Sequence, residues 1–170
     1  YTLFSKIFYD DTQEDYSSHD VEQYKEKYVK LIVVNKKDLY EFDKFVDRTL
    51  LNSQKIKTKS REIVIDNCLA NVALCSFESL CAVNLAHEDY KNIASRFSLL
   101  FIENIPEFTD ELADQCRRFI SLIDMLYEQN CSTVLLAATP ITSLCRINKL
   151  VKEFERTVSR LYEMTIIKPS

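Results

Sequence analysis

The 170-residue chain contains no glycine. Glycine makes up roughly 7% of an average sequence, and it provides backbone conformations that other residues adopt at a cost. A phosphate-binding loop needs glycines so that its backbone N–H groups can approach the phosphate closely. The chain accordingly holds no GxxxxGK[ST], GxGxxG or GxSxG motif, and no complete nucleotide site of these kinds lies within its 170 residues.

The overall composition is that of a globular domain with a hydrophobic core, since 46% of the residues are apolar and 28% are charged. The formal charge of −4 lacks the basic footprint of a nucleic-acid-binding protein, so no nucleic-acid partner is expected. The longest apolar runs, such as residues 134–138, are far shorter than the roughly 20 residues that span a bilayer. The chain begins without an initiator Met or a signal-peptide pattern, and we expect it to be a fragment of a longer protein.

The cysteines and histidines do not form a metal-binding pattern. Zinc sites require ligands paired two to four residues apart, and no CxxC pair is present. We predict buried free thiols in a reducing compartment, at positions 68, 75, 81, 116, 131 and 145. His19 and His87 are predicted to be exposed, which leaves no histidine for a Ser/His/Asp arrangement.

Residues 1–60 are interpreted as a family-variable segment with an acidic start and a basic second part. The stretch up to about residue 28 shows no clear period and is predicted to be loop with one short helix. A short strand at 31–34 and a helix at 39–50 follow from the apolar pattern. Residues 25–61 carry 11 Lys and Arg against 5 Asp and Glu, which favours a solvated face with a loop at 52–60 over a polyanion-binding surface.

A β-hairpin is predicted at the start of the second part, residues 61–170. Its strands are the alternating segment 61–66 and the apolar run 72–77. Asn67 and Asn71 lie between them, and asparagine tolerates the positive φ that glycine would otherwise provide.

The rest of this part alternates between apolar runs and amphipathic segments. The pattern predicts a helix at 87–97, a strand at 99–102, a long helix capped by Thr109, a strand at 132–140 and a helix at 147–164. Near-continuous apolar strands that alternate with helices are typical of a parallel sheet. The predicted fold is therefore α/β, a mostly parallel sheet with flanking helices and one β-hairpin.

Two arginines in the last predicted helix stand out as functional candidates. Arg156 and Arg160 are four residues apart, so they share a helical face that differs from the apolar face. One interpretation is ion pairing with Glu153, with Glu163 or with a neighbouring helix. The other is a phosphate-facing arginine that stabilises charge on a transferred phosphoryl group.

Two predicted strand ends compare only weakly with nucleotide-site motifs. The strand at 99–102 is followed by Glu103 and Asn104, where a magnesium-binding strand of a P-loop ATPase carries Asp and Glu. Thr139, near the end of the strand at 132–140, fits a polar sensor position loosely. A buried strand ending in polar residues is the better interpretation of the strand at 99–102.

Four blocks of the sequence, in this order and spacing, resemble the AFG-like ATPase family. The resemblance is strong over residues 61–164 and weak over 30–60. The first block carries Phe77, Leu80, Cys81, Asp89 and Tyr90, and the second is the strand LLFIENIP. The third carries Arg117, Arg118, Phe119, Ile120, Leu122, Ile123, Asp124, Leu126 and Tyr127. The fourth carries Phe154, Arg156, Thr157, Ser159, Arg160, Leu161, Glu163 and Met164.

The resemblance implies the C-terminal part of an AAA-type P-loop ATPase fold, a homo-oligomer, a mitochondrial location and a role in protein quality control. ATP and magnesium are expected for the complete protein, with neither held within this chain, and the partners are other subunits or protein clients. Alone, the chain is expected to be inactive. Arg156 and Arg160 are the candidate catalytic residues, and Arg117, Arg118 and Asp124 are candidate interaction residues.

An alternative function is a non-catalytic protein-interaction module that has lost nucleotide hydrolysis. In that case Arg118, Asp124 and Arg160 form structural ion pairs. Two departures from the family pattern favour this alternative: Asn104 replaces an aspartate, and residues 165–170 replace the family's glutamine and tyrosine.

Overall fold

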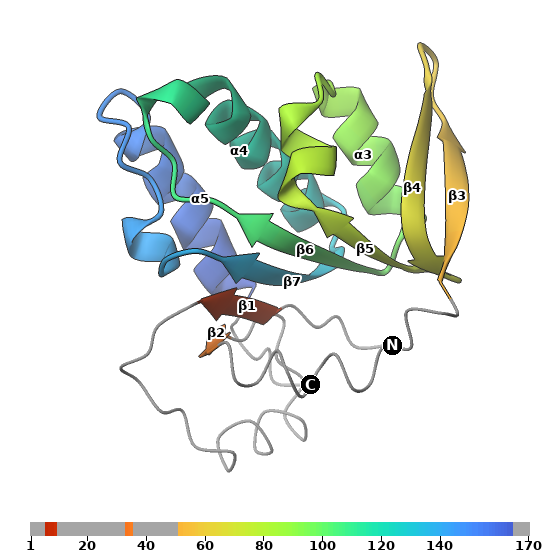
Figure 1. Ribbon diagram of the computed structural model, residues 1–170, viewed down its shortest axis with the longest axis horizontal. Helices are drawn as coiled ribbons and strands as arrows, with labels where there is room; N and C mark the ends of the chain where they lie inside the picture. Colours follow the sequence, from red (N-terminus) through yellow and green to blue (C-terminus); the bar gives the residue numbers. More distant parts are fainter. Residues whose placement is uncertain (1–5, 10–32, 36–50, 165–170) are drawn as a thin grey trace.

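The computed structural model describes residues 6–9, 33–35 and 51–164. Within them, seven strands form one mixed sheet in the order β2-β1-β7-β6-β5-β4-β3 (Figure 1). The strands are β1 Lys6–Tyr9, β2 Val33–Asn35, β3 Asn52–Lys57, β4 Glu62–Leu69, β5 Val72–Ser76, β6 Leu99–Ile105 and β7 Ser132–Ala137.

The described residues also contain three α-helices and three shorter helical turns. They are the π-helix η2 Glu78–Ala82, the helix α3 His87–Arg96, the 3₁₀ turn η3 Asp110–Leu112, the helix α4 Ala113–Glu128, the 3₁₀ turn η4 Ile141–Ser143 and the helix α5 Val151–Glu163. The helices α3, α4 and α5 lie side by side over one face of the sheet (Figure 1). None of the described helices has the length and apolar character that crossing a membrane requires.

The predicted α/β fold with a mostly parallel sheet is confirmed. β5, β6 and β7 are parallel neighbours, and α3 and α4 make the two crossovers between them. β1 is parallel to both β7 and β2, whereas β3 and β4 are joined antiparallel. The strands read as apolar runs because both faces are buried: Leu100 and Ile102 face the helices, and Phe101 beside Val134 lies on the opposite face.

Four aromatic rings form a cluster in the core between the helices and the sheet. The rings of Phe77, Phe108, Phe119 and Phe154 pack with centroid separations of 5.4 to 6.3 Å. They come from the end of β5, from the segment after β6, from α4 and from α5. Aromatic packing at these separations contributes beyond the burial of area, so this cluster ties α4 and α5 to the sheet.

Two predictions for the N-terminal part are wrong, and one lies outside the described residues. Lys6–Tyr9 was predicted as loop but is the strand β1. It pairs with β2 and β7, which lie far from it in the sequence. The predicted loop at 52–60 contains the strand β3, an edge strand with Ile56 as its only buried residue, so it lacks an apolar period. β2 overlaps the predicted strand at 31–34, while the predicted helix at 39–50 lies outside the described residues.

The predicted β-hairpin is present, but its turn differs in detail. β4 and β5 pair antiparallel at only two positions, Cys68 with Ala73 and Leu69 with Val72. The residue with positive φ in this turn is Ala70, at 52°, not an asparagine. Asn104 and Asn130, at 60° and 53°, do occupy positions of this kind elsewhere, as expected for a chain without glycine.

The helix starts also differ from the predictions. Thr109 precedes the 3₁₀ turn η3, makes no capping hydrogen bond, and instead donates its hydroxyl to Glu111 at 2.8 Å. The helix α4 therefore begins later, at Ala113, and α5 begins at Val151, later than the predicted residue 147. The predicted strand at 99–102 continues to Ile105, past a register shift that contains Asn104.

Candidate functional site

The candidate arginines face a carboxylate on the neighbouring helix. Nη2 of Arg156 lies 3.2 Å from Oδ2 of Asp124, and Nη1 of Arg160 bonds to Oδ1 of the same carboxylate. Asp124 belongs to α4 and both arginines belong to α5, so one carboxylate joins the two helices. Of the two interpretations drawn from the sequence, ion pairing with the neighbouring helix is the one seen here.

Tyr127 and Glu163 extend this arrangement along the helix pair. The guanidinium of Arg160 lies over the ring of Tyr127, 5.4 Å from its centroid, and the Tyr127 hydroxyl donates to Glu163. This hydrogen bond raises the pKa of Tyr127. We call the group of Asp124, Tyr127, Arg156, Arg160 and Glu163 the interhelix cluster; its two cations and two carboxylates balance formally.

Helical spacing explains why the sequence places these side chains together. Asp124 and Tyr127 are three residues apart on α4, and Arg156, Arg160 and Glu163 follow at intervals of four and three on α5. The intervening face of α5 is largely apolar, and its buried residues are Phe154, Thr157 and Leu161. Packing of that apolar face fixes the helix against the core and brings the polar faces of α4 and α5 into contact.

The two arginines differ in exposure. The Arg156 side chain is 56% exposed and Arg160 only 24%, while Asp124 is 16% exposed. Arg160 is therefore enclosed between Asp124 and Tyr127, whereas much of Arg156 faces solvent. A guanidinium carries five N–H donors, so Arg156 has donor capacity beyond its contact with Asp124.

The other candidate interaction residues on α4 are not part of the interhelix cluster. Arg117 is exposed and pairs with Asp114, 3.0 Å away on the same helix. Among the described residues, the contact seen for Arg118 is a hydrogen bond and not the ion pair expected in the alternative function. It donates its Nε–H to the backbone carbonyl of Cys81 at 2.6 Å, because its side chain points toward η2 rather than toward α5.

A second polar arrangement, missed in the sequence analysis, surrounds η2. The Tyr90 hydroxyl donates to the carbonyl of Leu80 at 2.7 Å, beside the contact of Arg118 with Cys81. The carboxylate of Asp89, 2% exposed, accepts from the backbone N–H of Ala86 at 2.8 Å and lies 3.5 Å from Nε of Arg61. The block of family resemblance over residues 77–90 could have indicated this arrangement, because it includes Asp89 and Tyr90, whose side chains bond to the backbone around η2.

The weak nucleotide-site comparisons at the strand ends gain no support from the geometry. Asn104 lies at a register shift with positive φ, which asparagine tolerates, and this accounts for its place without a ligand. Thr139 follows β7, and within the described residues its buried hydroxyl has no hydrogen-bond partner. In the part of the chain that is described, no three His, Cys, Asp or Glu side chains come together as a metal site.

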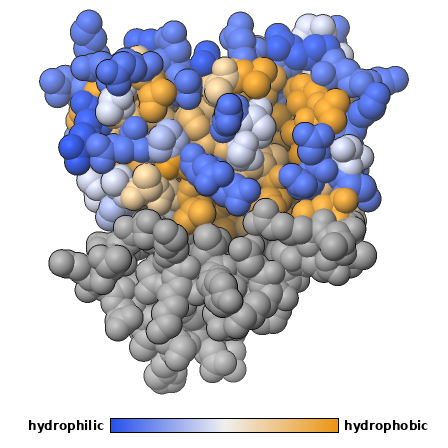
Figure 2. Space-filling model, viewed as in Figure 1, coloured by the Kyte–Doolittle hydropathy of each residue, from blue (hydrophilic) through white to orange (hydrophobic). Residues whose placement is uncertain are grey.

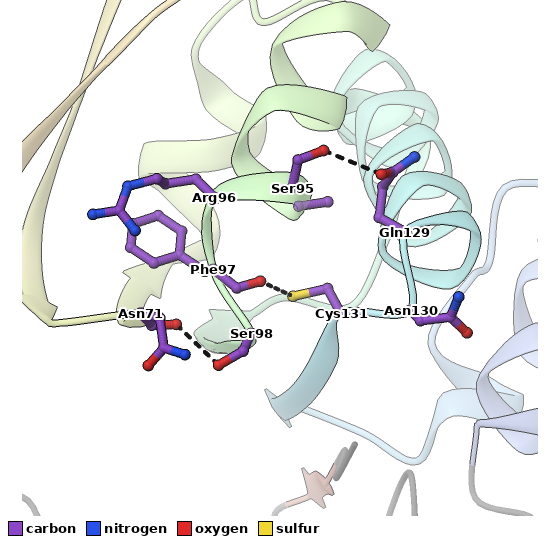
Figure 3. A pocket seen from close by; sticks show the side chains of 9 residues that line it. Asn71, Ser95, Arg96, Phe97, Ser98, Gln129, Asn130 and Cys131 are labelled. Atoms are coloured by element: carbon purple, nitrogen blue, oxygen red, sulfur yellow. Dashed lines mark hydrogen bonds between the residues drawn. The ribbon is translucent and has the colours of Figure 1, made fainter. Parts of the chain in front are cut away.

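A shallow depression of about 590 Å³ lies at the amino ends of β6 and β7, next to the carboxyl ends of α3 and α4 (Figure 3). Its polar side chains are already engaged with one another. Ser95 donates to Gln129 at 3.1 Å, and Ser98 donates to the carbonyl of Asn71 at 3.4 Å. The Cys131 thiol donates to the carbonyl of Phe97 at 3.2 Å, and burial raises the pKa of this thiol to about 12. The depression offers no nucleophile and no acid–base pair.

The predicted cysteine and histidine environments agree with the structure where it describes them. Five of the six cysteines are buried, Cys145 is partly exposed, and all are free. His87 is exposed, with Nδ1 3.1 Å from the Ser121 hydroxyl. His19 lies outside the described residues.

Parallel strands joined by crossover helices place the chain among the α/β proteins of the P-loop ATPase-like kind, although it has no phosphate loop of its own. Comparison with known families gives the particular group. The AFG1-like ATPase family matches residues 8–168, and the chain belongs to this family.

Curated relatives agree with this assignment. The chain is 31% identical over 126 residues to lactation elevated protein 1 homolog B of Danio rerio, covering 74% of this chain and 25% of the relative. It is 28% identical over 113 residues to the cell division protein ZapE of Escherichia coli, covering 66% and 30%. The chain thus spans less than a third of the length of these relatives. No solved structure matches significantly.

Proposed function

We propose that the chain is the C-terminal portion of an AFG1-like ATPase that uses ATP hydrolysis in mitochondrial protein quality control or assembly. Membership of the family supports this function. These 170 residues contain no glycine-containing phosphate loop. In this proposal ATP and Mg²⁺ therefore bind to other parts of the complete protein. The partners in this proposal are other copies of the protein and its protein clients.

The observation that carries the proposal for this chain is the half-exposed Arg156 beside Asp124. In phosphoryl transfer, proteins act mainly by positioning and by stabilising charge, and an arginine from a neighbouring subunit is a common source of that charge. Arg156 keeps guanidinium surface in solvent, whereas Arg160 is enclosed by Asp124 and Tyr127. We assign the contact with a nucleotide in a neighbouring subunit to Arg156 first and to Arg160 second.

The second candidate function is a non-catalytic interaction module. The interhelix cluster favours it to the extent that Asp124 already pairs with both arginines, which gives each a structural role. In this function the exposed parts of Arg156 and Arg117 belong to a helix surface that docks a partner, while Arg118 supports η2 through its bond to the Cys81 carbonyl. Nucleotide binding by the complete protein separates the two functions.

The test uses the complete protein with Arg156→Ala and measures turnover and KM for ATP. We expect turnover to fall at least about tenfold with KM nearly unchanged, because the lost interaction forms in the transition state. Lys152→Ala, an exposed cation one turn earlier on α5, is the matched control and should leave turnover unchanged. Unchanged turnover in Arg156→Ala removes the catalytic assignment, and failure of the complete protein to bind ATP in calorimetry favours the interaction module.

A further inference from the structure

The strand β3 forms one end of the described sheet and has an open edge. It pairs with β4 on one side, and within the described residues no strand pairs with its other side (Figure 1). The register runs without interruption from Gln54 opposite Ile65 to Lys57 opposite Glu62. An open edge with a regular register is a template on which another strand can pair.

The turn after β3 shows which backbone groups face the open edge. The Thr58 N–H donates to the Arg61 carbonyl at 2.9 Å, so the backbone N–H of Thr58 points toward the β4 side. Hydrogen-bonded and non-hydrogen-bonded pairs alternate along an antiparallel ladder. Ile56 therefore has the same orientation as Thr58, whereas Lys55 and Lys57 direct their backbone N–H and C=O groups outward. These are the groups with which an added strand would pair.

The open edge belongs to a basic stretch of the chain. Residues 51–61 carry four cations and no Asp or Glu: Lys55, Lys57, Lys59 and Arg61. The Lys55 ammonium lies 3.0 Å from Glu62, but among the described residues neither Lys57 nor Lys59 has a carboxylate partner. Both are exposed, and Figure 2 shows hydrophilic residues along this margin of the molecule. The edge therefore presents positive charge, although the whole chain has a formal charge of −4.

Hydrogen bonds hold the turn that follows this edge in place. The Thr58 hydroxyl donates to the Arg61 carbonyl at 3.1 Å and accepts from the N–H groups of Ser60 and Arg61 at 3.4 and 3.2 Å. The Arg61 guanidinium donates to the Asn84 carbonyl at 2.8 Å and lies 3.5 Å from Asp89 of α3. The hairpin is thus attached to the helix layer. A pre-formed edge loses little conformational entropy when a segment binds to it.

We propose that the open edge of β3 binds an extended, acidic segment of a partner protein, which adds a strand to the sheet. In this binding mode main-chain hydrogen bonds give affinity, and they form with Lys55 and Lys57. Both lysine side chains lie on one face of β3, so carboxylates at alternate positions of the segment face them. The residues between these carboxylates lie on the other face, where Ile56 is buried, and apolar side chains fit there.

Two other occupants fit the edge less well. A second copy of β3 would place lysines opposite lysines, and like charges directly opposite each other destabilise strand pairing. A nucleic acid cannot form the main-chain pairing, and residues 51–61 contain no aromatic side chain on which bases stack. The inference concerns a surface that the proposed function does not use, and it does not depend on that function.

The test titrates the 170-residue chain with a fluorescein-labelled peptide of alternating Glu and Val and measures fluorescence anisotropy. We expect saturable binding that weakens as the salt concentration rises from about 50 to about 300 mM, because exposed charges are screened. Three control probes should each bind at least about tenfold more weakly: a peptide of alternating Lys and Val, the Glu–Val peptide with N-methylated backbone amides, and a single-stranded oligothymidylate. Failure of the Glu–Val peptide to bind, or equal binding of any control probe, overturns the proposal.

Charge-reversal variants assign the binding to β3 and its turn. The double variant Lys57→Glu, Lys59→Glu should weaken binding of the Glu–Val peptide at least about tenfold. The matched control is Lys149→Glu, Lys152→Glu, which changes the net charge equally at exposed positions in and before α5. It should weaken binding by less than about twofold, because the charges are far from the strand. Equal losses in the two double variants contradict a site at β3.

Hydrogen exchange of the parent chain tests the strand addition itself. In the free chain the amides of Lys55 and Lys57 should exchange rapidly and that of Ile56 slowly, because only Ile56 donates to β4. Saturation with the Glu–Val peptide should slow exchange at Lys55 and Lys57 at least about tenfold. Unchanged exchange at both lysines in the saturated chain overturns the proposal.

Discussion

Arg118 on α4 donates its Nε–H to the backbone carbonyl of Cys81 in η2, across 2.6 Å. The preceding carbonyl of Leu80 accepts from the Tyr90 hydroxyl at 2.7 Å. Carbonyls at the end of a helix lack partners within the helix, and buried ones need other donors. Side chains from α3 and α4 therefore satisfy the irregular turn that connects β5 to α3.

The contact of Arg118 with Cys81 predicts a clear cost of removing the donor. Arg118→Ala should lower the free energy of unfolding by about 2 kcal/mol, because a buried carbonyl loses a charged donor. Urea unfolding followed by circular dichroism measures this change. Arg117→Ala, next to it and exposed, is the matched control and should change stability by less than about 0.5 kcal/mol. Equal effects of the two substitutions contradict the structural role of Arg118.

The interhelix cluster predicts energetic coupling between α4 and α5. Asp124→Ala and Arg160→Ala should each destabilise the chain, and the double variant should lose less than their sum by about 1–2 kcal/mol. The reason is that Asp124→Ala leaves the partly buried Arg160 without its carboxylate, while Arg160→Ala leaves Asp124 with only the more exposed Arg156. A double-mutant cycle from urea unfolding gives the coupling energy, and Asp124 with the exposed Lys152 is a control pair that should show none. Additive losses for Asp124 and Arg160 are incompatible with the observed contact.

Much of the fold in residues 61–164 was predictable, because each strand there is an apolar run and each helix has an amphipathic period. The N-terminal strands were not. β1 is four residues long and depends on pairing with distant strands, whereas β3 is an edge strand that pairs with the adjacent β4 and buries only Ile56, so neither shows a local apolar period. The turn at Ala70 was also beyond local rules, since alanine has no preference for positive φ.

The candidate site was predictable as a set of residues but not as a geometry. Spacing on α5 showed that Arg156 and Arg160 share a face, and it left a neighbouring helix among the possible partners. Asp124 pairs with both arginines and Arg118 faces η2. Both contacts depend on the orientation of α4 about its own axis relative to the neighbouring elements. This orientation is set by the packing of Phe119 and Phe154, which no periodicity in one helix determines.

The buried thiols predict a loss of stability in alkali. Burial raises the pKa of Cys75, Cys81 and Cys131 to about 12, whereas unfolded thiols ionise near pH 8.5. Their contribution is fully present below about pH 8.5 and is lost as the pH rises toward 12, because only the unfolded chain releases these protons. Above pH 9 each thiol should lower the free energy of unfolding by about 1.4 kcal/mol per pH unit.

Urea unfolding at pH 7.5, 9 and 10 in a reducing buffer checks this dependence. Cys75→Ala should reduce the slope of the unfolding free energy against pH, above pH 9, by about the contribution of one thiol. The variant itself should be less stable than the parent chain at pH 7.5. A slope that is the same for Cys75→Ala as for the parent chain shows that the Cys75 thiol ionises normally in the folded state.

The turn between β4 and β5 predicts a stabilising glycine in a chain that has none. Ala70 has a φ of 52°, a region where a side chain with a Cβ costs about 1 kcal/mol and glycine costs nothing. Ala70→Gly should therefore raise the free energy of unfolding by about 0.5–1 kcal/mol, after the greater entropy of unfolded glycine is subtracted. Ala94→Gly inside α3 is the matched control and should lower it by about 1 kcal/mol or more. Thermal and urea unfolding of both variants decide the matter, since a destabilising Ala70→Gly is inconsistent with a left-handed residue at this position.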